Sequence, residues 1–243
     1  MNNTATLEQM QLLRLQGMAG AYEAITALPL NRQPEAHELI AQLTQAELQH
    51  RTHRRTGMFI KLSKLRFSAR LEEIVCSSDR NLSKKQLTAL ADCQYITRSE
   101  NLLITGATGC GKSFLACALG HQACLIGFKT HYFNLNRFVE KITLSRLDGT
   151  FVKMLNQLDK FPLVILDDFG LQPLDQSTKL ALLQLLEDRY AKRSTIIASQ
   201  LPVAKWHEYL GDPTLADAIM DRITTNAHRF ELKGPSLRTK KSQ

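Results

Sequence analysis

Residues 106–113 read GATGCGKS, a pattern of loops that bind the phosphates of a nucleotide. In such a loop, backbone N–H groups and the positive end of the following helix converge on an anion, so a strand must precede the loop and a helix must follow it. The apolar run ENLLIT precedes it, and FLACALGHQACLIG follows with apolar residues at helical spacing. A glycine-rich turn without a ligand is the alternative. The predicted nucleotide contacts are Gly106, Ala107, Thr108, Gly109, Cys110, Gly111, Lys112, Ser113 and Phe114.

Within this loop, two side chains have distinct predicted tasks. Lys112 is expected to reach the β- and γ-phosphates, and the hydroxyl of Ser113 is expected to be a ligand of Mg²⁺.

Two adjacent carboxylates, Asp167 and Asp168, close the apolar run FPLVIL. A strand end inside a core is a costly place for charge, so a pair of acids there predicts a function. We expect Asp167 to lie beside Mg²⁺ and Asp168 to orient or deprotonate an attacking water. A pair that only caps a turn is the alternative.

Polar residues also follow a later apolar run, STIIAS, which ends at Ser199 and Gln200. A side chain there can hold the attacking water or respond to the γ-phosphate. Farther on, Arg222 lies near the end of a predicted helix. It either pairs with Asp221 at the surface or stabilises charge on the γ-phosphate of a neighbouring subunit, which requires an oligomer.

From residue 101 onward the sequence alternates strand and helix, which predicts a parallel sheet with helices on both faces. The front third is helical, with patterns over 6–27 and from about 34 to 64. Caps are expected at Ser83 and Gly127. The predicted strands are 101–105, 129–133, 163–167, 194–199 and 228–232. The predicted domains are 1–70, helical, for DNA binding and self-association; 71–98, connecting; 99–234, nucleotide-binding; and 235–243, a basic tail.

The composition is that of a globular protein with one main core and a smaller attached domain, at 243 residues and 44% hydrophobic. The sequence has no run of 18 apolar residues and no signal-peptide pattern at its start, so we expect no membrane association and a cytoplasmic location. The five cysteines form no C-x-x-C pair, which favours reduced thiols; Cys110 is a candidate for alkylation.

Positive charge is unevenly distributed in this chain of net charge +8. Residues 50–70 contain seven Lys or Arg and no acid, and the C-terminal tail adds four more against one Glu. Such clusters beside a nucleotide domain favour double-stranded DNA as a partner, although a merely solvated basic surface is the alternative. The predicted DNA-binding residues are Arg51, Arg54, Arg55, Lys61, Lys64, Arg66 and Arg70.

Taken together, the motifs resemble the IstB-like ATPases, insertion-sequence transposition helpers of the AAA+ superfamily related to DnaC-type helicase loaders. The similarity spans roughly residues 7–239 and includes ENLLITGATGCGKS, LVILDDFGLQPLD, DRYAKRSTIIASQLP, GDPTLADAIMDRI and ELKGPSLR. The resemblance implies an AAA+ P-loop NTPase core, with a five-stranded parallel sheet, behind a small all-helical N-terminal domain. It also implies ATP and Mg²⁺ as cofactors, with double-stranded DNA, a cognate transposase and an ATP- and DNA-dependent homo-oligomer as partners.

The resemblance also implies roles for individual residues. Asp167 and Asp168 fall at Walker B, where many AAA+ proteins carry Asp-Glu, so slow, DNA-stimulated hydrolysis is expected. Ser199 and Gln200 fall at sensor 1, with Gln200 where many relatives carry Asn. Arg222 falls at the arginine finger, and Arg238 is a candidate second sensor. With Lys112, the catalytic set is Asp167, Asp168, Ser199, Gln200 and Arg222.

Two other functions share most of these features. A DnaC-like replicative helicase loader has the same ATPase core but docks its N-terminal helices on a helicase. A nucleotide-gated DNA-binding scaffold with little ATP turnover is consistent with the Asp-Asp pair. A small-molecule kinase is disfavoured, since no motif indicates a pocket for a second substrate.

Overall fold

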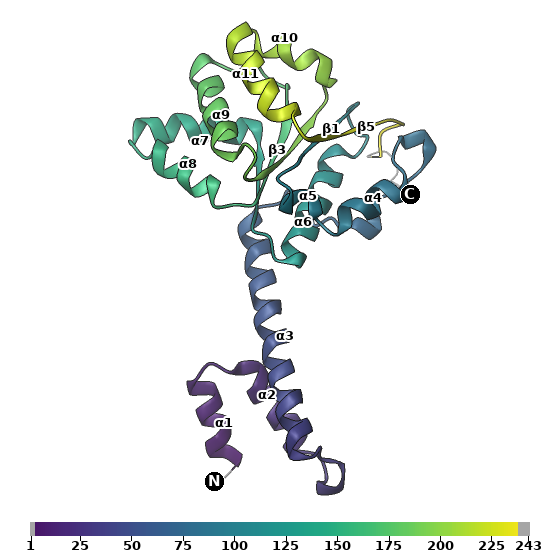
Figure 1. Cartoon of the computed structure of the whole chain (residues 1–243), viewed down its shortest axis with the longest axis vertical. Coiled ribbons are helices and arrows are strands. Elements are labelled where there is room, and N and C mark those ends of the chain that lie inside the picture. The colour runs from purple at the N-terminus through teal and green to yellow at the C-terminus, as the bar shows by residue number, and fades with distance from the viewer. Residues whose placement is uncertain (1–2, 238–243) are drawn as a thin grey trace. The chain divides into compact units, whose positions relative to one another are not determined.

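A five-stranded parallel sheet forms the centre of the structure, a computed structural model that describes residues 3–237 (Figure 1). Its strands are β1 (Asn101–Gly106), β2 (Thr130–Asn134), β3 (Leu163–Phe169), β4 (Ser194–Ser199) and β5 (Ala227–Leu232), in the order β2-β3-β4-β1-β5. This confirms the predicted strands to within two residues at each end. Because β4 lies between β1 and β3, the segments that follow these three strands are neighbours at one edge of the sheet.

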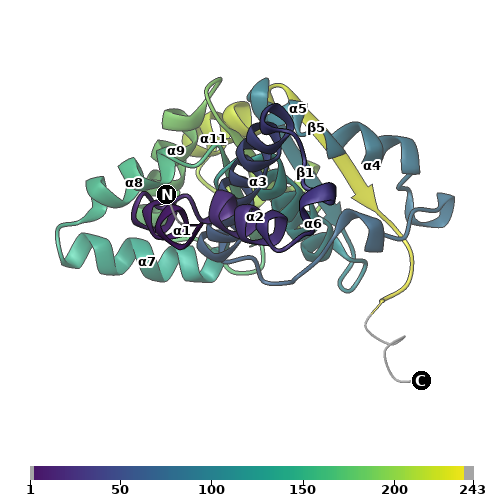
Figure 2. The same ribbon diagram turned by 90° about the horizontal axis from the view of Figure 1, so that it is seen from below.

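Helices cover both faces of the sheet, as predicted, because strand residues alternate between two cores. On β1, Leu102 and Ile104 join one core and Leu103 joins the other. The first core includes residues of α4 (Lys84–Ala91), α5 (Gln94–Thr97) and α6 (Lys112–Ile126). The second includes residues of α7 (Leu135–Leu147), α8 (Phe151–Asp159), α9 (Gln176–Arg189), α10 (Trp206–Leu210) and α11 (Pro213–Thr224). In both Figure 1 and Figure 2, α7 and α8 lie on one side of β1 and α4 on the other.

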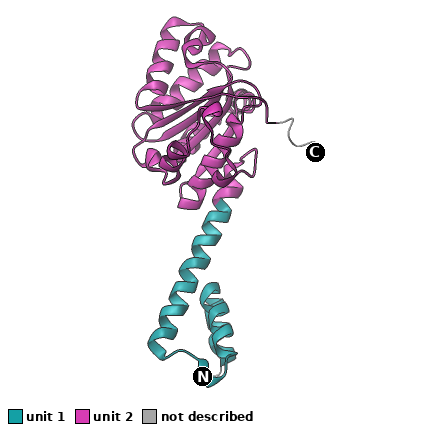
Figure 3. Ribbon diagram, turned by 90° about the vertical axis from the view of Figure 1, so that its right-hand side faces the viewer, with its two compact units in different colours: residues 1–58 teal, residues 59–243 magenta. Residues whose placement is uncertain are grey.

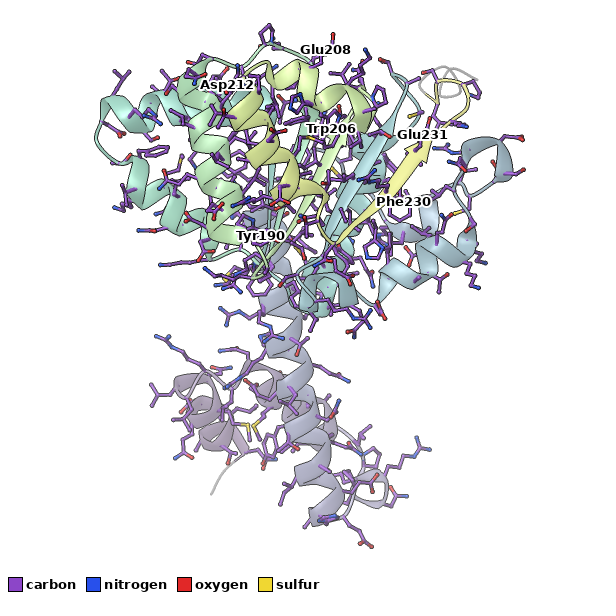
Figure 4. All side chains as sticks on the ribbon, turned by 45° about the horizontal axis from the view of Figure 1, so that its top comes forward. Tyr190, Trp206, Glu208, Asp212, Phe230 and Glu231 are labelled. Carbon is purple, nitrogen blue, oxygen red and sulfur yellow. The ribbon has the colours of Figure 1, made fainter. Side chains whose placement is uncertain are left out.

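Aromatic packing completes the second core. Trp206 is fully buried, donates its indole N–H to the Leu201 carbonyl at 2.9 Å and lies 4.8 Å from the ring of Phe169 (Figure 4). On β5, buried Phe230 alternates with exposed Glu231, as expected for a strand with one covered face.

The chain divides into two compact units, residues 1–58 and 59–243 (Figure 3). This division differs from the predicted boundary at 70, and residues of the predicted connecting segment 71–98 pack on the sheet of the second unit. The physical reason is burial: Ala69, Leu82, Leu87 and Leu90 belong to the core that covers one face of the sheet. Short 3-10 helices, η2 (Leu71–Glu73) and η3 (Ser78–Arg80), lead into α4, whose N-cap is Ser83 as predicted.

The first unit is helical, as predicted. The single pattern over 6–27 forms two helices, because the chain turns at Arg14, where φ is +59°. The carboxylate of Glu47 accepts hydrogen bonds from the backbone N–H groups of Gly17 and Met18 at 2.8 and 3.2 Å, which fixes one helix against the next. Its elements are α1 (Asn3–Leu12), α2 (Gln16–Thr26), η1 (Leu30–Arg32) and most of α3 (Ala36–Ser63).

Two further observations concern the described residues 3–237. No helix among them combines the length and apolar character needed to cross a membrane. All five cysteines are free thiols, as expected. Cys110 is only 1% exposed, so the expectation that it is open to alkylation is wrong: the loop turns its thiol into the core.

Candidate nucleotide site

The glycine-rich loop turns sharply between β1 and α6 and leaves backbone N–H groups at the start of α6 unpaired. Gly111, with φ of +93°, is the N-cap of α6. Gly106 has φ of +146°, and a Cβ atom there would lie 2.2 Å from the Leu232 carbonyl oxygen, so only glycine fits. The N–H groups of the first helical turn have no partner within the helix and are available to an anion.

Lys112 and Gln200 both contact the phosphate loop. The ammonium of Lys112 is buried and donates a hydrogen bond to the Ala107 carbonyl at 2.8 Å. At the end of β4, the Gln200 side-chain oxygen accepts a hydrogen bond from the Thr108 hydroxyl at 2.8 Å. Thr108 and Gln200, which belong to two separate sequence motifs, are therefore in direct contact.

Ser199 behaves differently from its neighbour Gln200. Its buried hydroxyl donates to the Phe169 carbonyl and accepts from the Leu201 N–H at 3.0 Å. Ser199 thus joins the ends of β3 and β4, whereas Gln200 reaches the loop.

The two carboxylates at the end of β3 are held by donors from β2. Asp167 is 1% exposed and accepts hydrogen bonds from the Tyr132 hydroxyl at 2.7 Å and from the Asp168 backbone N–H at 2.9 Å. Asp168 accepts a hydrogen bond from the Asn134 side-chain amide at 2.5 Å. Tyr132 and Asn134 are two positions apart on β2, so both point to the same face.

Asp168 lies in a special backbone conformation. Its φ is +61°, and the pairing of β3 with β4 shifts register between Leu166 and Phe169. A local irregularity of this kind turns a side chain away from the regular alternation of the strand. Both acids therefore lie at the same end of the sheet as the phosphate loop.

Electrostatics differ between the groups of this cluster. Burial and the charge of Asp167 raise the pKa of the Asp168 carboxyl, against opposing effects of Arg66, Asn134 and Lys112. Burial and the Asp167 carboxylate raise the pKa of the Tyr132 phenol well above its ordinary value. Tyr132 therefore remains a hydrogen-bond donor to Asp167 at physiological pH.

The structure adds residues that the sequence reasoning missed. The guanidinium of Arg80 is largely buried and donates to the Cys110 carbonyl at 2.6 Å. The backbone N–H of Leu237 donates to the Gly109 carbonyl at 3.0 Å. These contacts support the outer side of the phosphate loop. Arg238, the predicted second sensor, lies outside the described residues, as does the rest of the basic tail after it.

Arg222 lies on the opposite side of the sheet from the phosphate loop, at the edge where the strands begin. It precedes β5, and its carbonyl accepts a hydrogen bond from Asn101 at the start of β1. Its guanidinium contacts Glu187 at 2.7 Å and Asp221 at 2.8 Å, so the pairing with Asp221, one of the two alternatives for this residue, is present within the single chain. Within one chain, Arg222 is therefore not brought to the phosphate loop.

A pocket rich in arginine surrounds Arg222, and among the described residues that line it there is no Asp or Glu. Arg189 at its base is buried and donates to backbone carbonyls at the starts of β3 and β4, including Ser194 at 2.6 Å. The ring of Tyr190, which Figure 4 labels, belongs to this region, and its centre lies 5.5 Å from the Arg222 guanidinium. The lining arginines are Arg98, Arg189, Arg193 and Arg222.

All seven predicted DNA-binding residues are exposed, but two of them are engaged within the chain. Arg51 pairs with Glu47 at 2.7 Å, and Arg66 lies 3.4 Å from Asp168. Arg51, Arg54 and Arg55 are spaced three and four residues apart on α3 and so share one side of the helix. The remaining exposed residues of the set are Lys61, Lys64 and Arg70.

The donor groups at the loop fit Mg²⁺. Among residues 3–237, no group of three or more His, Cys, Asp or Glu side chains forms a metal site. Magnesium bound with a nucleotide needs only one or two protein oxygen ligands, because phosphates and waters supply the others. The Ser113 hydroxyl and the Asp167 carboxylate are hard oxygen donors of this kind.

The sheet order, the phosphate loop and the acids at the end of β3 define a P-loop ATP-binding protein with the AAA+ fold. A family model described as IstB-like ATP binding protein matches residues 8–243. The chain belongs to this family.

Relatives from insertion sequences match over most of their length. A Sinorhizobium fredii protein named as an insertion sequence ATP-binding protein, y4pL, is 40% identical over 96% of this chain and 95% of the relative. The corresponding ATP-binding protein of IS1162 from Pseudomonas fluorescens is 40% identical over 81% of this chain and 86% of the relative. That of IS21 from Pseudomonas aeruginosa is 27% identical over 95% and 87%.

Solved structures share the fold at lower identity. DnaI superposes with a TM-score of 0.60 at 19% identity, over 68% of this chain and 92% of DnaI. The DnaC helicase loader gives 0.57 at 17% identity, over 69% and 98%. The replication initiator DnaA, bound to AMPPCP and single-stranded DNA, gives 0.58 at 18% identity, over 71% and 52%. At these identities the likeness is one of fold.

Proposed function

We propose that this protein is a cytoplasmic, Mg²⁺-dependent ATPase that assembles on double-stranded DNA and assists a cognate transposase in selecting and remodelling its target. The insertion-sequence names of the relatives support the biological setting. One structural observation carries the mechanism: the phosphate loop and Arg222 lie at opposite edges of the same sheet. A second protomer can supply the cation that the first lacks.

In this mechanism, the phosphate loop and Lys112 bind the triphosphate, while Ser113 and Asp167 hold Mg²⁺. When bound, Mg²⁺ neutralises charge that develops on the phosphates. Asp168, held by Asn134, orients the attacking water. Gln200 contacts the phosphate loop through its hydrogen bond with Thr108 and so responds to the state of the γ-phosphate. Arg222 of a neighbouring protomer, which lines one pocket together with Arg98 and Arg193, would face the γ-phosphate.

Slow turnover is part of the proposal. An Asp side chain is one methylene shorter than Glu, and Asp168 is further restrained by Asn134. Arg222 is paired with Glu187 in the isolated chain, so assembly on DNA must first exchange that pair. Both features support hydrolysis that accelerates on DNA.

Sedimentation velocity with a duplex and a non-hydrolysable ATP analogue tests this function. We expect the wild-type protein to form nucleotide-dependent oligomers on DNA and Lys112→Ala to remain unassembled, because the variant lacks the cation that binds the β- and γ-phosphates. Lys153→Ala, which removes an exposed cation on α8, is the matched control and should assemble normally. Equal assembly of Lys112→Ala and wild type would refute the proposed function.

A second variant in the same experiment separates DNA binding from nucleotide binding. Replacing Arg54, Arg55 and Lys61 together with alanine should weaken DNA binding and flatten its salt dependence, since fewer counterions are released. The affinity for nucleotide should stay unchanged. A normal salt slope in this variant would remove these residues from the DNA-binding surface.

The helicase-loader function remains a second candidate, because the first unit exposes large apolar side chains. Leu12, Leu30, Ile40 and Leu48 are each more than 60% exposed. Such side chains suit contact with another protein, whether a second copy or a helicase. Binding assays against a replicative helicase and against an insertion-sequence transposase separate the two functions. Phosphate release with and without duplex DNA tests the low-turnover scaffold.

A further inference from the structure

Arg66 contacts the acids at the end of β3, although the sequence grouped it with residues for DNA. Its Nη1 atom lies 3.4 Å from Oδ2 of Asp168 and 4.0 Å from Oδ2 of Asp167. Tyr132 and Asn134 donate to these same two oxygen atoms. Three side chains therefore donate to or contact the carboxylate pair, and of these three only Arg66 carries a positive charge.

The main chain on both sides of Arg66 is anchored, so this position is not that of a freely moving surface side chain. Helix α3 ends at Ser63, and Lys64 has φ of +54°. Leu65 packs on the core beside Gly120, and Ala69 is fully buried.

Neighbouring groups on α6 fix the same segment. Burial raises the pKa of the Cys117 thiol to about 11, and the backbone groups of Phe67 and Arg66 near its sulfur oppose this rise. The ring of Phe67 lies 6.1 Å from that of Phe114, the residue after the Mg²⁺ ligand Ser113. The Arg66 guanidinium also lies 5.3 Å from the Phe67 ring. Arg66 is thereby directed at the acids from a short, well-packed segment.

We propose that Arg66 is a positioning residue that neutralises Asp167 and Asp168 in the nucleotide-free protein and competes with Mg²⁺ for them. The inference deepens the proposed function and rests on it. Two cations cannot share one carboxylate pair without mutual repulsion, so Arg66 withdraws as the metal site fills. Its withdrawal loosens the packing of residues 64–70. This segment begins directly after α3 and includes the basic residues Lys64 and Arg70.

This arrangement links the metal site to the end of α3 in both directions. If loaded Mg²⁺ weakens the hold on residues 64–70, a partner that draws this segment away strengthens Mg²⁺ binding by the same factor. DNA bound to Lys64 and Arg70 is such a partner. The link gives a physical route by which DNA promotes loading of the metal with ATP.

Titration of Mg²⁺ against a protein saturated with a fluorescent ATP analogue tests the competition. Arg66→Ala and Arg66→Gln should lower the Mg²⁺ concentration at half-saturation by about twofold to tenfold, as expected for loss of one partly exposed cation beside the acids. Arg66→Lys, which keeps the charge, should stay near wild type, and Lys153→Ala is the distant control. Unchanged or weaker Mg²⁺ saturation in both Arg66→Ala and Arg66→Gln would overturn the proposal.

Hydrogen exchange supplies a readout independent of activity. In the wild type, the amides of residues 64–70 should exchange faster with analogue and Mg²⁺ than with analogue and EDTA. In Arg66→Gln, exchange should already be fast in EDTA. Identical wild-type exchange in both conditions would overturn the proposal.

A separate measurement keeps the two proposals apart. Nucleotide binding in EDTA should be lost in Lys112→Ala and retained in all Arg66 variants. Retained binding in Lys112→Ala refutes the phosphate-loop function, whereas only the Mg²⁺ titration and the exchange experiment judge Arg66.

Discussion

The sheet has a carboxyl edge, where its parallel strands end, and an amino edge, where they begin. These two edges carry opposite kinds of chemical group. At the carboxyl edge, buried acids accept hydrogen bonds from Tyr132 and Asn134, and the backbone at Asp168 adopts a positive φ. At the amino edge, arginines line a pocket, and Arg222 is paired with surface acids. The carboxyl edge has groups that suit a metal and a triphosphate, and the amino edge has positive groups that can neutralise the charge of a triphosphate.

Under the proposed function, this difference makes each edge half of a hydrolytic site. The carboxyl edge has positioned donors around its acids, but within one chain it lacks Arg222. The amino edge has the arginine, but the chain carries its phosphate loop at the far end of the strands. Joining the two edges between protomers makes a complete site, which gives a physical reason for assembly to control hydrolysis.

Mixing two inactive variants tests whether the two edges form one site between protomers. Among the predictions, it has the largest expected effect on the rate of hydrolysis. Arg222→Ala alone should lower the hydrolysis rate by about 10³-fold, as for other arginine fingers. Mixed with Lys112→Ala, it should recover part of the activity, since a Lys112→Ala protomer still donates Arg222 to a neighbour with an intact loop. Phosphate release measures both effects.

Arg137→Ala is the matched control for this mixture. Arg137 is likewise ion-paired, with Glu140 at 3.0 Å, but it lies on α7 and does not line the arginine pocket. Its replacement should leave hydrolysis near wild type. Absence of recovery in the mixture, with both variants folded and binding DNA, would place Arg222 outside the site.

Asn134→Ala tests how the carboxyl edge positions Asp168, and we expect an effect of intermediate size on kcat. It removes the hydrogen bond that holds Asp168, so we expect a fall in kcat of about tenfold to a hundredfold. Nucleotide affinity should change little, because Asn134 does not contact the phosphate loop. Measuring both kcat and the dissociation constant of the analogue separates an effect on turnover from an effect on nucleotide affinity.

Asn134 is also the N-cap of α7, so a structural control is needed. Asn134→Ser keeps a capping oxygen but cannot reach Asp168 as the amide does. A low kcat in Asn134→Ser with an unchanged melting temperature supports positioning of Asp168. Wild-type turnover in both variants would contradict it.

The sequence predicted the sheet and most of the site because those features are local. The strand before GATGCGKS, the acids after LVIL and the polar end of STIIAS are each visible in a short window. The parallel sheet then brings their ends together without further information. Asn134 ends β2 in the same way as the acids end β3, so the same rule could have found it.

Arg66 and Arg80 could not be predicted, because their roles depend on contacts distant in sequence. Arg66 is 102 residues from Asp168, and Arg80 is 30 residues from Cys110. In the sequence, Arg66 is one of several basic residues after a helix, and charge alone indicates a solvated or DNA-facing side chain. The division of the structure at residue 58 differs from the predicted boundary for a related reason, since burial of Ala69 and Leu82 depends on tertiary packing.

Glu187→Gln tests how firmly the amino edge is held before assembly, and it has the smallest expected effect. Glu187 contacts Arg222 at 2.7 Å and is half exposed, so the pair is a surface ion pair of modest strength. Removing the charge of Glu187 should leave Arg222 held only by Asp221 and lower the protein concentration for half-maximal assembly with the analogue by up to about fivefold. Glu140→Gln, which breaks the surface pair on α7, is the matched control. Weaker assembly of Glu187→Gln than of the control would mean that Glu187 presents Arg222 to the neighbour rather than withholding it, and the amino edge would then be preorganised in the isolated chain.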